Sequence, residues 1–542
     1  MRKLLIYIFF LFSAIPSFSQ SDIILHSGKI FTADTSRPWA EAIAIQGNVI
    51  VAVGKTEDIL KWQTDSTKLI NLKGKTVVPG FNDAHCHIGP THAFQHFSLA
   101  GQMADPTPWV LVKDSVLANV ARAGKGTILL TEINPDLFED PSIRRKKLDS
   151  IAPAHPLILM ANTGHGVLLN SKALQLLGIT ENTRLAGGSI EKDENGRLTG
   201  YCTEYAGFNI SQKINENIFG GYITQDLDRI YLELASMGIT SLQNMTTSLT
   251  PERYRFYYLK HAFPLRIRLI PFLMTDEAGL KYKEWVDLLD ASYKNTSIRG
   301  IKIILDGTPI ERLATVRKPY SDKPGYFGNL DFNKTELKKF LQFGIDYKQQ
   351  ILVHAVGDSA IQFLFNTMLE MQPAPFWKNR RVRVEHGDLL SPDQYATAKA
   401  LGIIVVINPL HFGLPAVMNA RYAGERMKYF QSAKTLLQQG IPIAIGSDGP
   451  ANPYLNMMLA VLNPDNPQEG LSIEQAVTAY TMGSAYAEFM ENRKGSITTG
   501  KFADLVVVSD DIFSMKPADL IRARTILTIM DGRIIFDSGE LK

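Results

Sequence analysis

Cysteine is nearly absent from this chain, which has only Cys86 and Cys202 among its 542 residues. Two cysteines can form at most one disulfide, and Cys86 lies inside a His-Cys-His motif, so we expect no structural disulfide. Nothing next to Cys86 favours a thiolate, and we interpret it as a small buried side chain rather than a nucleophile. Hydrophobic residues make up 45% and charged residues 20% of the chain, which is typical of a globular protein with an ample core.

The chain also lacks an excess of charge of either sign. It has 57 lysines and arginines against 54 aspartates and glutamates, a formal net charge of +3, which gives no bias towards polyanions. No GxxxxGK[ST] loop is present and no GxGxxG follows a strand-like run, so nucleotide chemistry is disfavoured. We therefore expect a small-molecule substrate and no nucleic-acid partner, and we leave a homo-oligomer open.

Long hydrophobic runs are missing apart from one at the N-terminus. Two basic residues precede an apolar run from Leu4 to Phe12, and serines follow at the spacing of a cleavage site. A membrane anchor needs roughly 20 apolar residues, and this run is interrupted earlier. We predict a signal peptide over residues 1–19 and export to the periplasm or secretion, with an uncleaved anchor as the alternative. Cleavage removes two positive charges and changes the formal net charge from +3 to +1.

Both ends of the chain are rich in short β-type runs separated by glycine turns. DIILHSGKIFTAD and EAIAIQGNVIVAVG lie near the N-terminus, and KGSITTGKFADLVVVSDD and TILTIMDGRIIFDSG lie near the C-terminus. Neither end alone is long enough to bury both faces of a sheet. We therefore expect residues 20–79 and 492–542 to form one composite β-sandwich.

Between the two ends, β-type runs alternate with helical stretches, which is the pattern of parallel βα units. The candidate strands are VVPGFNDAHCH, GITSLQNM, LRIRLIPFL, IRGIKIILDG, QQILVHAVGD, RVRVEHGD, GIIVVINPLH and IPIAIGSDG. Eight such runs predict the α/β class and a (β/α)₈ TIM-type barrel over residues 80–491. About 150 residues separate the first two runs, which is far more than an ordinary βα connection, so we expect an inserted lobe over about residues 100–225 at the barrel mouth.

Histidines stand at the ends of these strand-like runs. His85 and His87 are two residues apart, so their side chains point to the same side of the first strand and Cys86 points to the other. His354 and His386 end the fifth and sixth runs, which are neighbours in a barrel. Closure of the barrel places the eighth run beside the first, and thus Asp448 beside His85 and His87.

Imidazole and carboxylate donors that converge at one rim suit a divalent cation, most of all Zn²⁺. A single histidine in a strand is more often a satisfied core residue than a ligand. Five such residues at five strand ends would be an improbable coincidence, which favours a metal site. His165 and His411 lie where the lobe and the barrel mouth should meet, and both are candidate substrate contacts.

Several of these motifs together resemble the amidohydrolase superfamily, in particular its family 3 branch of YtcJ-like enzymes and N-substituted formamide deformylases. The resemblance rests on VVPGFNDAHCH, HAVGD, VEHGD, IGSDG and KGSITTGKFADLVVVSDD and extends over essentially the whole mature chain. It implies that His85 and His87 bind the more buried metal, that Asp448 bridges metal and attacking water, and that His354 and His386 bind a second metal or hold substrate.

The resemblance also singles out Lys302. In many relatives a lysine late in the fourth strand is carboxylated and bridges two metals, and Lys302 in IRGIKIILDG is the matching residue. The alternative is an ordinary lysine paired with Asp306 in a one-metal site. Asp306 is also a candidate substrate contact.

The chemistry that follows is hydrolysis of a carbon–nitrogen bond, with an N-acyl or N-formyl amine as the expected substrate. A bound cation lowers the pKa of water from about 15.7 towards 7, and Asp448 acts as general base and then as general acid towards the leaving nitrogen. Deamination or cyclic-amide hydrolysis at the same site is an alternative reaction. A catalytically silent barrel that only binds a ligand is an alternative of a different class.

Overall fold

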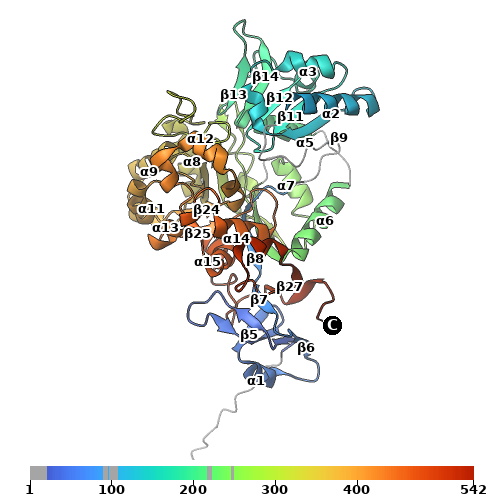
Figure 1. Cartoon of the computed structure of the whole chain (residues 1–542), viewed down its shortest axis with the longest axis vertical. Helices are drawn as coiled ribbons and strands as arrows, with labels where there is room; N and C mark the ends of the chain where they lie inside the picture. The colour runs from blue at the N-terminus through green and yellow to red at the C-terminus, as the bar shows by residue number, and fades with distance from the viewer. Residues whose placement is uncertain (1–20, 90–94, 97–107, 217–221, 246–248, 542) are drawn as a thin grey trace, which may run out of the picture.

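The computed structural model describes residues 21–89, 95–96, 108–216, 222–245 and 249–541. Three regions follow one another along the long axis of the molecule (Figure 1): a small β unit, a central region with parallel strands, and a lobe at the opposite end. Among the described residues, no helix is both long and apolar enough to cross a membrane. The signal peptide expected over residues 1–19 lies outside the described residues.

The small β unit contains two sheets built from both ends of the chain. Their strand orders are β5-β4-β1-β6 and β28-β27-β26-β7-β2-β3. The strands are β1 (Ile23–His26), β2 (Lys29–Phe31), β3 (Trp39–Ala40), β4 (Ala42–Gln46), β5 (Val49–Gly54), β6 (Lys68–Asn71), β7 (Thr76–Pro79), β26 (Leu505–Val508), β27 (Thr525–Met530) and β28 (Arg533–Asp537), and helix α1 is Thr56–Ile59. Because β26 pairs antiparallel with β7, the expectation that the two ends share a sheet is confirmed.

The central region contains two arcs of parallel strands. The first arc has the order β20-β16-β15-β8 and the second β21-β22-β23-β24-β25. The strands are β8 (Phe81–Cys86), β15 (Ile239–Asn244), β16 (Arg266–Leu269), β20 (Thr296–Ile298), β21 (Ile301–Ile304), β22 (Ile351–Ala355), β23 (Arg383–His386), β24 (Ile404–Ile407) and β25 (Ile443–Ile445). Each strand-like run expected from the sequence is therefore extended in the structure, and the α/β class is confirmed.

The fourth run differs from the expectation because it is divided between β20 and β21. Gly300 lies between these strands with a φ of +87°, a left-handed conformation that suits glycine and interrupts the extended backbone. Its N–H donates to the side-chain oxygen of Gln349 rather than to a neighbouring strand. A strand that changes partner in this way contributes to both arcs.

The two arcs meet at two places. At the first, Lys302 N–H donates to the Pro271 carbonyl at 2.8 Å, and Leu273 N–H donates to the Lys302 carbonyl at 3.0 Å. At the second, Asp448 N–H donates to the His85 carbonyl at 2.9 Å. A Cβ at Gly446 would lie 2.3 Å from the Cβ of His85, so the close approach of β25 to β8 requires glycine there. The carboxyl ends of β8 and β25 therefore lie side by side.

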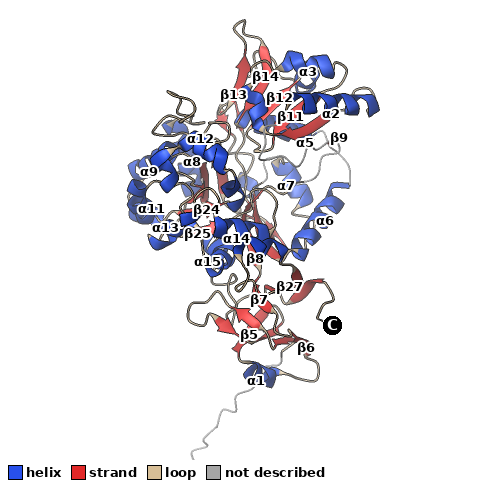
Figure 2. Ribbon diagram, viewed as in Figure 1, coloured by secondary structure: helices blue, strands red, loops and turns tan. Residues whose placement is uncertain are grey.

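Helices surround the two arcs (Figure 2). They are α6 (Tyr222–Ser236), α7 (Pro251–Tyr257), α8 (Lys334–Asp346), α9 (Asp358–Met371), α10 (Ala374–Lys378), α11 (Tyr395–Leu401), α12 (Pro415–Tyr422), α13 (Ala433–Gln438), α14 (Pro453–Leu462), α15 (Ile473–Thr478) and α16 (Ser484–Ala487). Helix α8 begins with a capping box formed by Asn333 and Glu336, and it buries Leu337, Phe340 and Leu341. An apolar helix face of this kind explains why the outward-pointing side chains of the arc strands are hydrophobic.

The lobe is a six-stranded sheet with the order β13-β14-β12-β11-β10-β9. Its elements are β9 (Gln95–His96), β10 (Leu129–Ile133), β11 (Leu157–Ala161), β12 (Gly166–Leu169), β13 (Ser189–Lys192) and β14 (Leu198–Thr203), with helices α2 (Trp109–Arg122), α3 (Arg145–Ile151), α4 (Ser171–Leu177) and α5 (Tyr205–Glu216). A short hairpin of β17 (Thr275–Asp276) and β18 (Gly279–Leu280) lies outside the arcs. The lobe sheet has a hydrophobic cluster on each face, so it has a core of its own.

Candidate metal site and cavity

The first pair of candidate ligands comes from the end of β8. The His85 side chain is buried, whereas the His87 side chain is 38% exposed. Their Nε2 atoms lie 3.2 Å apart. Asp448, which follows β25, places Oδ1 3.6 Å from His85 Nε2 and 3.2 Å from His87 Nε2. The strand order that the sequence predicts therefore brings these three side chains together.

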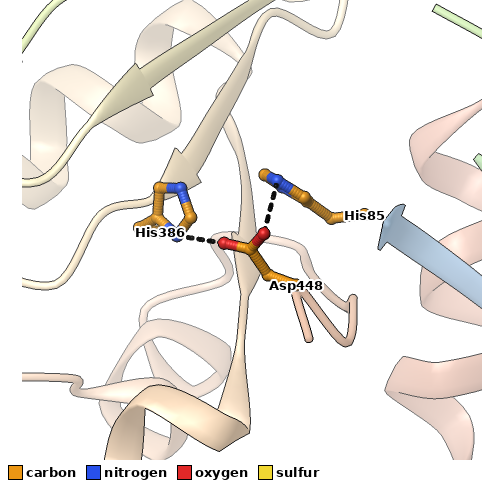
Figure 3. Close-up of side chains that lie close together, drawn as sticks. All are labelled: His85, His386 and Asp448. Atoms are coloured by element: carbon orange, nitrogen blue, oxygen red, sulfur yellow. Dashed lines mark ion pairs between the residues drawn. The ribbon is translucent and has the colours of Figure 1, made fainter. Parts of the chain in front are cut away.

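The second pair comes from β22 and β23. His386 Nδ1 lies 3.8 Å from Asp448 Oδ2, and the ring centroids of His354 and His386 are 4.3 Å apart. His386 has a φ of +70° and Asp448 a φ of +43°, conformations that side-chain-bearing residues rarely adopt. Strained backbone of this kind concentrates at functional sites. Figure 3 shows Asp448 between His85 and His386, with one carboxylate oxygen towards each.

These side chains fit a divalent cation. One donor atom from each of His85, His386 and Asp448 lies within 4.8 Å of the other two. His354 Nε2 and His386 Nδ1 are buried, and neither has a hydrogen-bond partner in the described part of the chain. A buried ring nitrogen without a partner requires an explanation, and coordination of a cation supplies one.

The protonation states are those that metal ligands require. Burial lowers the pKa of His85 to about 4, and burial likewise lowers the pKa values of His354 and His386 well below the usual range. Burial by itself raises the pKa of Asp448, but the neighbouring His85 and His87 outweigh it and hold that pKa well below its ordinary value. Neutral imidazoles and an ionised carboxylate are therefore ready to bind a cation.

Lys302 lies on β21 at the base of the same group. It is 1% exposed, and its Nζ is 3.4 Å from the sulfur of Met245. Burial lowers the pKa of Lys302 to about 8, so a considerable fraction of the amine is neutral near pH 8. Among the ion pairs of the described residues, none joins Lys302 to Asp306.

Asp306 has a different environment from the one expected. It is fully buried, and its carboxylate accepts backbone N–H groups from Thr315 at 2.8 Å and from Val356 and Gly357 at 2.9 Å. These bonds tie the segment after β21 to the end of β22. The structure does not bring Asp306 to the cavity or to Lys302, because its oxygens are occupied by the backbone.

The two remaining candidates, His165 and His411, both reach the site. His165 precedes β12 of the lobe, and its ring centroid is 5.1 Å from that of His354. His411 follows β24; its Nε2 lies 3.4 Å from Asp448 Oδ2, and its ring stacks on His386 at 5.2 Å. The lobe and the carboxyl ends of the arc strands thus face each other across the candidate ligands.

All of these histidines line one cavity of about 640 Å³. Its base is formed by the strand ends and Lys302, and its roof by lobe residues between Glu132 and His165. Apolar side chains complete the wall, including Phe208, Phe272 and Leu410. A mostly apolar cavity with a few convergent polar groups is typical of a small-molecule site.

A model of the amidohydrolase family matches residues 68–536 of the chain. The chain belongs to the amidohydrolase family. It is a metal-dependent hydrolase that acts on carbon–nitrogen bonds, and the family resemblance expected from the sequence is confirmed.

Curated relatives align with this amidohydrolase over nearly its full length. YtcJ of Bacillus subtilis, a predicted amidohydrolase, is 28% identical over 95% of this chain and 99% of its own. The protein LONG AFTER FAR-RED 3 of Arabidopsis thaliana is 27% identical over 96% of this chain and 92% of its own. The N-substituted formamide deformylase of Arthrobacter pascens is 25% identical over 95% of this chain and 98% of its own.

Solved structures share the fold of the amidohydrolase. An uncharacterized metal-dependent hydrolase from Pyrococcus horikoshii superposes with a TM-score of 0.69 at 22% identity, covering 92% of this chain and 99% of its own. An adenosine deaminase from Xanthomonas campestris with bound zinc gives a TM-score of 0.53 at 15% identity, covering 97% and 95%. At these identities the similarity establishes the fold alone.

A buried glutamate behind His85 was missed in the sequence. His85 Nδ1 lies 2.7 Å from Glu385 Oε2, and Arg383 binds both oxygens of Glu385 at 2.7 and 2.8 Å. Burial alone raises the pKa of Glu385, but Arg383 and the bond to His85 hold it well below its usual value. An ionised carboxylate only accepts, so His85 Nδ1 donates to Glu385, and the lone pair on Nε2 is left free to coordinate a cation. The available signal was the alternation of Arg383 and Glu385 before His386 in RVEH.

We predict that Glu385→Gln weakens metal binding by about 10- to 100-fold, because the amide no longer fixes the His85 tautomer as firmly. Metal affinity is measured by competition with a chromophoric chelator. The control is Glu469→Gln, a buried glutamate that accepts from Thr435 at 2.7 and 2.8 Å, remote from the cavity. Equal affinities of the two variants and the parent protein would contradict the role of Glu385.

His165 has a similar buried partner in Glu204. His165 Nδ1 lies 2.9 Å from Glu204 Oε2, and Glu204 adopts a φ of +51°. Burial raises the pKa of Glu204, with the nearby Glu311 as the second cause. Glu204 follows β14, whereas His165 precedes β12, and these strands are antiparallel neighbours. The pairing of two lobe strands therefore fixes the ring that faces His354.

Proposed function

We propose that this amidohydrolase hydrolyses the amide bond of an N-acyl or N-formyl amine, with a divalent metal held at the cavity base. The observation that carries the proposal is the convergence of His85, His386 and Asp448, with the unpartnered ring nitrogens of His354 and His386, inside a substrate-sized cavity. The full-length likeness to an N-substituted formamide deformylase supports the choice of an amide.

The metal is most consistent with Zn²⁺, given nitrogen and oxygen donors. We assign His85, His87 and Asp448 to one metal position and His354 and His386 to a second. Lys302 becomes the bridging ligand if its buried amine is carboxylated, for which the lowered pKa supplies neutral amine. Two metal equivalents and the added mass of carbon dioxide on Lys302 are the expected result in the two-metal form, and one equivalent contradicts it.

When bound, the cation lowers the pKa of water and polarises the substrate carbonyl. Asp448 is placed to take the proton from the attacking water, because its two oxygens face different histidines and its carboxylate is ionised. The same carboxyl group then donates that proton to the leaving nitrogen, so the amine departs neutral. His165 and His411 face the remaining space and are assigned to substrate contact.

Removal of the metal tests this function. Dialysis against a chelator is expected to lower the hydrolysis of N-formyl amines by at least about 100-fold, since a catalytic metal supplies several kcal/mol to the transition state. Addition of Zn²⁺ is expected to restore it. A metal-containing protein that turns over neither N-acyl and N-formyl amines nor cyclic amides or aminated heterocycles would favour the silent binder. Turnover restricted to aminated heterocycles would favour a deaminase.

We further propose that the two parallel arcs together form one (β/α)₈ barrel, with the lobe over its mouth and a terminal β-sandwich. The two inter-arc contacts, at Lys302 and at Asp448, support closure. The limits at residues 20–79, 80–491 and 492–542, and the lobe over about 100–225, stay predictions. A homo-oligomer is also an open prediction.

We propose that the enzyme is exported after loss of residues 1–19. N-terminal sequencing of protein recovered from the periplasm or the medium is expected to start near residue 20, because the apolar run ends before a small-residue site. Protein that keeps residues 1–19 and stays in the membrane fraction would instead support an anchor.

A further inference from the structure

The cavity wall has a marked imbalance of charge. Besides Asp448, the acidic residues Glu132, Asp136 and Asp388 line it. The only lysine or arginine among its described lining residues is Lys302, which is 1% exposed at the base. A substrate therefore meets carboxyl groups on the roof and side wall, while the one lysine is almost fully buried at the base.

Glu132 is the acidic group of the roof. It lies on β10 of the lobe, where it is the exposed residue between buried neighbours, and it pairs in register with Met160 of β11. Both side chains line the cavity. In the described part of the chain, no hydrogen bond or ion pair reaches the Glu132 carboxylate. A lone carboxylate on a rigid strand that faces the cavity is placed to interact with a ligand.

Asp388 is the acidic group of the side wall. It follows His386 and Gly387 and is only 6% exposed, yet it lines the cavity. No described residue forms a hydrogen bond or an ion pair with its side chain. When ionised, a carboxyl group this buried disfavours a second negative charge close by, because little solvent is present to screen the repulsion.

The arginines near the rim are already paired. Arg312 binds Asp322 at 2.9 Å and also pairs with Glu139. Arg421 pairs with the same Asp322, and its Nη2 lies 3.8 Å from Asp136 Oδ1. The charge of Asp136 is therefore offset, whereas those of Glu132 and Asp388 are not. Both guanidinium groups connect the lobe to the segment after β21. Neither is available for a substrate carboxylate without loss of these contacts.

The internal segments outside the described residues add no lysine or arginine. Residues 90–94, 97–107, 217–221 and 246–248 contain no lysine and no arginine. These segments therefore supply no lysine or arginine to the cavity wall.

We infer that the substrate is an amide without negative charge, neutral or cationic, and that amides carrying a carboxylate, such as N-acyl amino acids, are rejected. This inference rests on the proposed function. A substrate carboxylate away from the scissile amide would lose its water beside Glu132 and Asp388 without a cationic side chain in exchange, because the metal of the proposed function is held at the base by its ligands and serves the scissile carbonyl. A neutral or cationic group has no such cost, and Met160, Phe208, Phe272 and Val417 offer it an apolar wall.

Three N-formyl compounds test the inference on the zinc-loaded full-length protein. N-formylphenylalanine is anionic, its primary amide has nearly the same shape without the charge, and N-formyl-2-phenylethylamine lacks the group altogether. We expect kcat/KM for the acid to be lower than for its amide by on the order of 100-fold, as like-charge repulsion in a partly dry site predicts. Equal values for the acid and the amide would overturn the inference and leave the proposed function intact. Failure to hydrolyse all three compounds and their N-acetyl counterparts would contradict the proposed function, and the inference would fall with it.

Reversing the charge of Glu132 tests whether this roof residue causes the preference for the amide over the acid. Glu132→Lys is expected to reduce the preference for the amide over the acid by at least about 10-fold, mainly by raising kcat/KM for the acid. Because Glu132 is exposed on its strand, the change leaves the lobe core intact. Glu181→Lys makes the same change at an exposed lobe residue outside the cavity lining and should leave the preference unchanged. An unaltered preference in Glu132→Lys would show that the roof carboxylate does not select the substrate.

Discussion

Replacing Asp448 with asparagine is expected to lower kcat by about 10²- to 10⁴-fold while much of the metal stays bound. The amide keeps the size of the side chain and one oxygen donor, but it can no longer take a proton from water or return it to the leaving nitrogen. Metal content measured by elemental analysis, together with kcat on an N-formyl amine, separates the two effects. Asp276→Asn, the same change at an exposed position, serves as the control.

Two other outcomes for Asp448→Asn are informative. Substantial retained hydrolysis would remove Asp448 from the role of base. Complete loss of metal would make Asp448 chiefly a ligand, because its oxygens lie 3.2 Å from His87 Nε2 and 3.4 Å from His411 Nε2. Measuring metal and rate on the same sample therefore decides between a catalytic and a binding role.

Replacing Arg383 with methionine is expected to lower the free energy of unfolding by about 3–5 kcal/mol. Arg383 and Glu385 are both fully buried, and the guanidinium also donates to Gln243 at 2.5 Å and to the Ala84 carbonyl at 2.7 Å. The shorter, apolar side chain leaves Glu385 buried without its cation. Removing one partner of a buried ion pair lowers the free energy of unfolding by more than the intact pair contributes to it, because the remaining charge is buried without a partner.

Urea unfolding of the zinc-loaded protein measures the effect of Arg383→Met. The matched control is Arg381→Met, two residues earlier, whose partner Glu491 lies at 2.6 Å in a pair that is partly open to solvent. The double variant Arg383→Met with Glu385→Gln should recover part of the stability, since no charge is then stranded. A loss no larger than that of Arg381→Met would show that water or a rearranged neighbour compensates Glu385.

Much of the candidate site followed from local patterns in the sequence. His85 and His87 share a side of β8 because side chains alternate along a strand, and Cys86 points the other way, with its sulfur 3.5 Å from the Gln243 carbonyl. Asp448 meets the pair because the carboxyl end of β25 lies beside that of β8, as the predicted strand order requires. The expectation for Asp306 did not match its environment. Three backbone N–H groups, from Thr315, Val356 and Gly357, donate to its oxygens. The local sequence pattern does not show that these segments lie beside Asp306.

By itself, the sequence determined the α/β class, the shared sheet of the two chain ends, the family and the side chains that could bind a metal. These depend on residue periodicity and strand order, which a linear chain displays directly. Only the tertiary structure decided that Glu385 supports His85, 300 positions away, that Glu204 holds His165, and that Glu132 and Asp388 face one cavity. Contacts between strands and lobes that are distant in the chain arise from packing, and packing leaves no repeating mark in the sequence.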